Sequence, residues 1–119
     1  MLQVIALVLL SQQPMMPVVA EGAASYYTVS SSSSRTASGE RLRDNENTCA
    51  LRDGNFGDYY LFVCKETGNS VVCRLNDRGP FHKGRVADLS KSAMKALDND
   101  FSEGVINVKV YKLGPMPAQ

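Results

Sequence analysis

Two runs rich in Val, Tyr, Phe and Leu, joined by a short polar turn, constrain the fold of this chain more than any other feature. Asp58–Cys64 and Ser70–Leu75 favour extended backbone, because β-branched and aromatic side chains fit a pleated surface. The segment between them, Glu66–Asn69, is typical of a hairpin turn. Gly79–Pro80 ends the second run, since proline cannot donate to a strand ladder. The sequence therefore predicts a β-hairpin.

Most of the remaining chain is also predicted to form short strands. Ala24–Thr28 and Thr48–Leu51 are candidate strands, and Ile106–Val110 alternates apolar and polar residues like a half-buried final strand. Ser90–Leu97 repeats apolar residues at helical spacing, with Asp88 or the first residue of this segment as N-cap. Several strands with one short helix indicate a mainly-β protein built as a small barrel.

Composition limits the classes of function. The chain has 119 residues, of which 44% are hydrophobic and 21% charged, which fits one globular domain. A formal net charge of +1 lacks the basic surface of a nucleic-acid binder. One His and three Cys are too few for a usual tetrahedral zinc site, so we expect no bound metal. No motif indicates an organic cofactor, and we expect none. We also expect a monomer.

The amino end differs from the rest in composition. Leu2–Leu10 is almost wholly apolar but too short to span a bilayer, which takes roughly 20 apolar residues. It resembles the apolar part of a secretory signal peptide, although no basic residue precedes it; a buried first strand or a cloning remnant are the alternatives. We expect removal of residues 1–20, with Ala23 as another cleavage position. The domain would then cover 24–113, with a tail at 114–119, exported to the periplasm, the cell wall or the outside, with no transmembrane or lipid anchor.

Three cysteines, Cys49, Cys64 and Cys73, are compatible with one disulfide and one free thiol in an exported protein. A four-residue loop over Thr67–Ser70 would place Cys64 opposite Cys73 in the hairpin. A tighter turn would pair Cys64 with Val71 and keep the two thiols apart. In a third alternative, all three cysteines are free and buried.

Two polar loops contain the candidate chemistry. Thr36–Glu40 and Asn76–Arg85 each place a carboxylate beside a glycine turn, Glu40 in the first and Asp77 in the second. Two carboxylates in one groove can divide the work of cleaving a glycosidic bond: one donates a proton and the other stabilises positive charge. The alternative is a plain Asp–Arg turn and a solvated glutamate. The five serines at 30–34 are predicted to be a loop.

Four more residues are candidates with weaker signals. His82 is the one histidine and could move protons near neutral pH, but a surface position is the simpler reading. Tyr26, Tyr27 and Phe81 could stack on sugar rings, although tyrosines in strands more often pack against neighbouring strands. We take Tyr26 and Phe81 as candidate substrate contacts.

Three motifs together carry a family resemblance. Arg35–Glu40, Arg74–Phe81 and Gly84–Ser90 resemble the RlpA (rare lipoprotein A) family in order and spacing, and Ala24–Tyr27 resembles the opening strand of that family. The resemblance extends over Ala24–Leu113. It implies a six-stranded double-psi β-barrel with one short helix, distantly related to expansins and barwin-like domains, in an exported bacterial protein.

The resemblance also implies an activity. Members of the family are lytic transglycosylases, which cut the MurNAc–GlcNAc β-1,4 bond of peptidoglycan and leave a 1,6-anhydro product, preferring glycan strands without stem peptides. Carried onto this chain, Asp77 and Glu40 are the active-site carboxylates. We expect Asp77 to act as acid and then base, and Glu40 to stabilise developing positive charge, with the exchanged roles as the alternative.

Other motif positions receive supporting roles from the resemblance. Ser38, Asn76 and Arg78 would hold the glycan or orient the carboxylates, and Asp88 would tie crossing segments of the barrel together. The partner would be peptidoglycan glycan strands.

The chain departs from the family pattern at several positions. The family has Gly where this chain has Thr28, a Phe-His-Gly stretch where it has Ser31–Ser33, and a histidine where it has Leu51. The second function that we consider is therefore an expansin-like module that binds or loosens wall glycan without cutting it.

Overall fold

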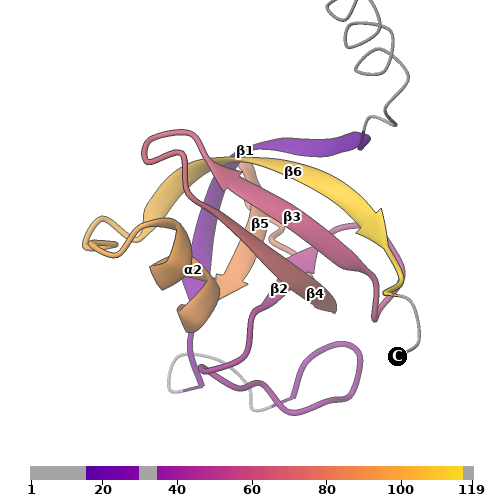
Figure 1. The fold of residues 1–119 in the computed structure, drawn as a ribbon. Coiled ribbons are helices and arrows are strands. Elements are labelled where there is room, and N and C mark those ends of the chain that lie inside the picture. Colours follow the sequence, from indigo (N-terminus) through magenta and orange to yellow (C-terminus); the bar gives the residue numbers. More distant parts are fainter. Residues whose placement is uncertain (1–15, 30–34, 117–119) are drawn as a thin grey trace, which may run out of the picture.

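The structure, a computed structural model, describes residues 16–29 and 35–116, and this part of the chain forms six strands and one short helix. The strands close into a barrel around a buried apolar interior (Figure 1). The predicted mainly-β barrel of six strands with one short helix is thereby confirmed. The elements are β1 (Val18–Tyr27), β2 (Thr48–Leu51), β3 (Tyr59–Cys64), β4 (Ser70–Arg78), β5 (Arg85–Ser90), α2 (Lys91–Leu97) and β6 (Val105–Gly114).

Neighbouring strands in the barrel are mostly not neighbours in the sequence. The order around the barrel is β1-β5-β2-β4-β3-β6, in which β1 runs parallel to β5 and β2 runs parallel to β4. Parallel neighbours cannot be joined by a tight hairpin and need a crossover connection. The crossovers place distant segments side by side, and in this way Asp77 on β4 comes to lie opposite Ala50 on β2.

Strand β1 begins earlier than the predicted Ala24. Most of it pairs with β6, from Val18 opposite Tyr111 to Ser25 opposite Val105. These cross-strand partners lie at least 80 positions away in the sequence, so no local pattern indicates them. Strand β5 was not predicted, because only Ala87, Leu89 and Ser90 of its six residues are buried and the alternation is too short to recognise.

Part of the predicted leader belongs to the barrel. Residues 18–20, the last three of the predicted leader 1–20, form the beginning of β1. Residues 1–15, 30–34 and 117–119 lie outside the described residues, and with them most of the leader, the five-serine loop and half of the predicted tail. Within residues 16–29 and 35–116, no helix combines the length and the apolar character that crossing a membrane requires.

The hairpin of β3 and β4 forms as predicted, but with a different register. Cys64 N donates to Asn69 O at 2.8 Å, so the four-residue loop is 65–68, and Cys73 lies opposite Tyr60. Both registers that we considered are therefore wrong, and Cys64 faces neither Cys73 nor Val71. All three cysteines are free and buried, which was the third alternative.

The interior of the barrel is largely apolar. Phe62, Leu75, Leu89 and Val108 are completely buried in one cluster that includes all three cysteines. Helix α2 adds its own buried face to this cluster, through Ala93, Met94 and Leu97. The interior is thus filled mainly with apolar side chains, and the few buried polar ones lie at its edge with the helix and the loops.

Ser90 caps helix α2, as one of the two predicted N-caps. Its Oγ accepts hydrogen bonds from Ala93 N at 3.4 Å and from Thr48 N at 3.2 Å, and the side chain is completely buried. We expect Ser90→Ala to lower the free energy of unfolding by about 1–2 kcal/mol, because two buried donors lose their acceptor. Urea unfolding of the variant measures this. Ser102→Ala, at an exposed position, is the control; an equal effect of both substitutions would contradict the capping role.

Candidate active site

The loop that carries Glu40 is closed by its own backbone. Arg35 and Arg41 pair as an isolated antiparallel bridge, and Thr36 N donates to Glu40 O at 2.9 Å. Gly39 N donates to Thr36 O at 2.9 Å, with a φ of 91° that other residues rarely adopt. The turn therefore requires glycine before Glu40 and fixes where Glu40 leaves this segment, residues 35–41, which we call the Glu40 loop.

The Glu40 loop is attached to strand β4 beside Asp77. Ser38 N donates to Asn76 O at 3.1 Å, and Ala37 N donates to Asp77 Oδ1 at 2.9 Å. The second bond joins residues 40 positions apart in the sequence. The structure thus brings both predicted motifs together: one loop provides Glu40, and its backbone holds Asp77.

A β-bulge at Asn76 gives the strand its shape at this point. Leu75 and Asp77 lie opposite the consecutive residues Cys49 and Ala50, so Asn76 is an extra residue in the ladder. Leu75 and Asn76 are both buried, whereas Asp77 is partly exposed, so the alternation of a regular strand is interrupted. The strand thus continues past Leu75, where the sequence predicted its end because the polar residues and Gly79–Pro80 that follow are typical of a turn.

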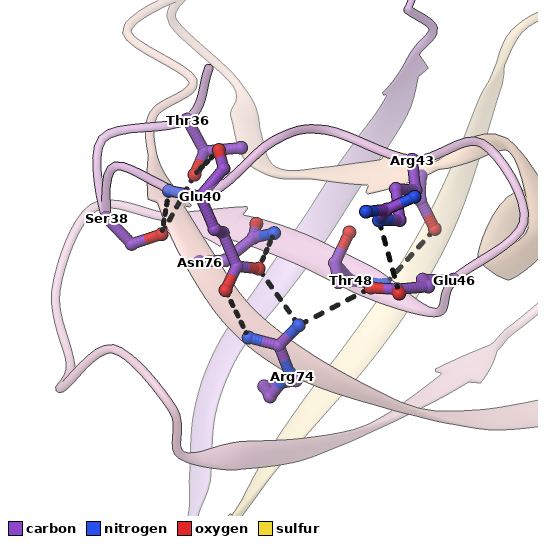
Figure 2. Close-up of polar contacts among 9 residues, drawn as sticks. Thr36, Ser38, Glu40, Arg43, Glu46, Thr48, Arg74 and Asn76 are labelled. Carbon is purple, nitrogen blue, oxygen red and sulfur yellow. Dashed lines mark hydrogen bonds and ion pairs between the residues drawn. The ribbon is translucent and has the colours of Figure 1, made fainter. Parts of the chain in front are cut away.

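Glu40 is held by two side chains of β4 (Figure 2). The guanidinium of Arg74 forms a fork on the carboxylate, with Nη1 donating to Oε2 at 2.9 Å and Nη2 lying 2.9 Å from Oε1. Asn76 Nδ2 donates to Oε1 at 2.7 Å. Planar guanidinium and carboxylate groups match each other in two parallel bonds, which fixes orientation as well as charge. Glu40 nevertheless remains open to solvent, since its side chain is 37% exposed.

These contacts decide the charge of Glu40. The hydrogen bond from Arg74 lowers the pKa of the Glu40 carboxyl, the bond from Asn76 adds to this, and partial burial opposes it. The pKa is therefore below its ordinary value of 4.5, and Glu40 is ionised at neutral pH. Asn76, one of the predicted binding residues, thus stabilises the ionised carboxylate of Glu40 by a hydrogen bond.

The lowered pKa of Glu40 predicts a pH dependence of stability. Because the folded protein binds the proton of Glu40 less tightly than the unfolded chain does, the stabilisation is present above about pH 4.5 and is lost as the pH falls through the folded pKa. We expect Glu40→Gln to lower the free energy of unfolding by no more than about 1 kcal/mol at pH 7, given the exposure of the pair. Urea unfolding at pH 7 and at about pH 3 measures this; a difference that grows towards low pH would contradict it.

Asp77 is held in a different way, by backbone groups. Its Oδ1 accepts from Ala37 N at 2.9 Å and from Arg78 N at 2.8 Å. Both bonds end on the same oxygen, so they orient the carboxyl without using Oδ2. The two acids therefore differ in environment: a cation binds Glu40, and neutral amides orient Asp77.

The side chain of Arg78 is directed to another loop. Its Nη2 donates to Gly54 O, and its guanidinium lies 4.2 Å above the centre of the Phe56 ring. Arg78 orients Asp77 through its backbone N–H, while its side chain fixes the loop between β2 and β3. Sequence reasoning missed Phe56, which no motif indicates.

The two predicted aromatic contacts differ in accessibility. Tyr26 packs edge-on against Phe101 at 5.0 Å between ring centres, and its ring is packed against the core. Phe81 is 81% exposed, in the loop that follows Asp77. His82 in the same loop is exposed, and its carbonyl accepts from Arg52 Nη2 at 3.1 Å. Of these two predicted contacts, Phe81 is thus the one whose ring remains open to a ligand.

Asp88 on β5 and Tyr27 on β1 lie on the pair of strands next to Asp77. Asp88 Oδ1 on β5 accepts from Ser25 Oγ on β1, and these residues are direct partners in the parallel pair. Tyr27 follows two positions later, and burial raises the pKa of its phenol, with the charges of Asp77 and Asp88 contributing. Tyr27 therefore stays protonated, and its burial agrees with strand packing, which the sequence offered as the alternative to stacking on a sugar.

The position where the family pattern has a histidine is apolar and buried. Leu51 is 5% exposed at the end of β2, opposite Arg78 on β4. It lines a cavity of about 510 Å³ at one end of the barrel, together with Arg52, Tyr60 and Val86. Leu51 offers no hydrogen bond there, so the imidazole is not replaced by another polar group at this position.

Comparisons with known proteins establish the family. A family model described as "Lytic transglycolase" matches residues 19–110. The chain belongs to this lytic transglycolase family. An RlpA protein of Treponema pallidum, named a probable endolytic peptidoglycan transglycosylase, is 41% identical over 98 residues, which cover 82% of this chain and 30% of that protein. The identically named protein of a Synechocystis strain is 46% identical over 87 residues, covering 73% of this chain and 27% of that protein.

These matches confirm the resemblance to RlpA proteins within the lytic transglycolase family. The chain spans less than a third of the length of the two relatives. An expansin of Clavibacter michiganensis, 20% identical, superposes with a TM-score of 0.62 over 83% of this chain and 52% of that chain. The predicted double-psi barrel is confirmed by the family and by this shared fold. In residues 16–29 and 35–116, no three His, Cys, Asp or Glu side chains are grouped as metal ligands.

Proposed function

We propose that this barrel is a peptidoglycan lytic transglycosylase domain that cleaves the β-1,4 bond between MurNAc and GlcNAc and leaves 1,6-anhydro-MurNAc. One observation supports the proposal: the loop that carries Glu40, itself bound by a cation, also donates a backbone amide to the carboxylate of Asp77. The names of the relatives support the same activity. The preferred substrate would be glycan strands poor in stem peptides.

Cleavage without water needs one group that first gives a proton and then takes one. We assign this group to Asp77. Its proton passes to the bridging O4 while the C1–O4 bond breaks; the oxygen of the muramic C6 hydroxyl then bonds to C1, and the hydroxyl proton passes to Asp77. The carboxyl ends the cycle in the form in which it began.

Glu40 has the complementary role. The transition state carries positive charge near C1, which a nearby fixed anion stabilises. Because Arg74 lowers the pKa of Glu40, this carboxyl is a poor proton donor at neutral pH, and this argues against exchanged roles. Its partial exposure leaves it accessible to a sugar.

The glycan would be bound by residues around the two acids. Ser38 is exposed beside Glu40, and Phe81 offers an open ring for stacking on a sugar face. Asn76 and Arg78 would act mainly by orienting Glu40 and Asp77, and Asp88 by joining β5 to β1. Tyr26 packs on Phe101 and would contact a glycan only with its outer edge.

The place of action would be outside the cytoplasm. We propose that residues 1–20 include a leader that directs the chain to the periplasm, the cell wall or the outside, as a monomer. The overlap of residues 18–20 with β1 favours a cleavage position before Val18.

The test is digestion of purified glycan strands from which the stem peptides have been removed. Mass spectrometry should detect fragments ending in 1,6-anhydro-MurNAc, accumulating in proportion to enzyme and time. Fragments with ordinary reducing ends would contradict the reaction type. Binding to the strands without any product would contradict the enzyme proposal and favour the expansin-like module, which the buried Leu51 would then explain.

A further inference from the structure

The guanidinium of Arg74 is shared between two carboxylates. Besides its fork on Glu40, Arg74 Nη2 lies 3.5 Å from Glu46 Oε2 (Figure 2). Glu46 in turn lies 3.7 Å from Arg43 Nε. The nitrogen that faces Glu46 is the same one that binds Glu40 Oε1, so the positive charge of one guanidinium is shared between two acids.

The fold holds both acids around this arginine. Glu40 and Glu46 belong to the connection between β1 and β2, and Arg74 belongs to β4. Arg74 N donates to Asn47 O at 3.1 Å, and Arg74 lies opposite Thr48 in the parallel pair, so the segment with Glu46 is fixed beside it. The backbone pairing of β2 with β4 therefore places Glu46 beside Arg74.

The charges around Glu40 come from two directions. From β4 it faces the cation of Arg74 and the amide of Asn76, with the carboxyl of Asp77 next along the strand. From its own connection the charged residues include Arg35, whose Nη1 donates to Gly39 O at 2.9 Å, Arg41, and the pair of Arg43 with Glu46. Arg74 is the cation that contacts Glu40 directly, and its side chain is 27% exposed, so solvent screens this pair less than an open surface pair.

We propose that Arg74 is a positioning residue that fixes the orientation and the charge of Glu40, and that Glu46 weakens this hold by placing a second negative charge beside the same guanidinium. The catalytic meaning of this inference rests on the proposed function, whereas its electrostatic part does not. Arg74 touches no reacting atom in this scheme and acts only through Glu40.

Three substitutions separate charge from geometry. Arg74→Gln removes the cation, so the pKa of Glu40 should rise towards 4.5 or above. Arg74→Lys keeps the charge but loses the planar fork. The pKa of Glu40 should therefore stay close to its wild-type value, while the activity falls further below that of wild type. Glu46→Gln removes the second anion, so the pKa of Glu40 should fall further.

The first readout is titration of the Glu40 carboxyl carbon by NMR in the full-length protein. The control is Glu21→Gln, which removes an exposed ion pair with Lys65 of 2.8 Å elsewhere on the barrel and should leave the titration of Glu40 unchanged. Opposite shifts for Arg74→Gln and Glu46→Gln are the expected result. An unchanged Glu40 midpoint in a folded Arg74→Gln protein would overturn the proposal.

The second readout is the pH profile of kcat on denuded glycan strands. For Arg74→Gln we expect kcat to fall at least about tenfold, as when one preorganised electrostatic partner is lost, with a smaller change in KM. The acidic limb should move to higher pH, and Arg74→Lys should restore part of kcat. A kcat like that of wild type in a folded Arg74→Gln protein would overturn the catalytic part. Absence of product from wild type, with the NMR shifts present, would instead overturn the proposed function alone.

Discussion

Replacing Asp77 with Asn should reduce the formation of 1,6-anhydro products by at least about 100-fold, because general acid–base transfer contributes about 10² to 10⁴ in rate. Asparagine retains an Oδ1 that can accept from Ala37 N and Arg78 N, so the Glu40 loop should keep its place. What disappears is the ability to give and take a proton. Initial rates on denuded glycan strands, quantified by mass spectrometry, measure the effect.

The control for this substitution is Asp100→Asn, at an exposed position after helix α2. Both variants should unfold in urea close to wild type, and the control should retain full activity. If Asp77→Asn kept more than about a tenth of wild-type activity, the proton would have to be transferred by another group. Glu40 would then be the first residue to test.

Replacing Phe62 with Ala should lower the free energy of unfolding by about 3–5 kcal/mol, the range for removing a buried aromatic ring. Phe62 is completely buried on β3 and lies between Val71 on β4 and Val110 on β6. The side chains around it are already closely packed, so they can fill the cavity left by the ring only in part. Since small domains have total stabilities of about 5–15 kcal/mol, much of the stability would be lost. Urea unfolding monitored by circular dichroism gives the value.

Val72→Ala is the matched control, because this side chain sits on neighbouring β4 but is 41% exposed. Its effect should stay within about 0.5 kcal/mol, as for most surface substitutions. A loss below about 1 kcal/mol for Phe62→Ala would mean that the ring is not part of a closely packed interior.

The contrast between Glu40 and Asp77 has a structural cause in the barrel. Asp77 is placed by the parallel pairing of β2 with β4 and by the bulge at Asn76. Glu40 is placed by a short turn that rests on the same bulge, through the bond from Ser38 N to Asn76 O. A shift of one residue in β4 would therefore disturb both acids together, which makes the site dependent on strand register.

Local patterns in the sequence were sufficient for several elements. The hairpin, helix α2 and strand β6 follow from apolar periodicity and turn residues, which act within a few positions along the chain. The same patterns missed β5 and the first half of β1, whose partners are distant in the sequence. They also gave wrong registers for the hairpin, because its turn uses residues 65–68 and leaves Cys64 opposite Asn69.

The order of residues along the chain defines which groups are available for chemistry: two acids beside glycine turns, in motifs that resemble one family. The folded barrel sets their partners, since Arg74, 34 positions from Glu40, binds this acid, while Asp77 receives backbone amides from Ala37 and Arg78. The physical reason is that a side chain's charge depends on its neighbours in space. In this barrel those neighbours are set by crossover strand pairing and a bulge, which no local periodicity encodes.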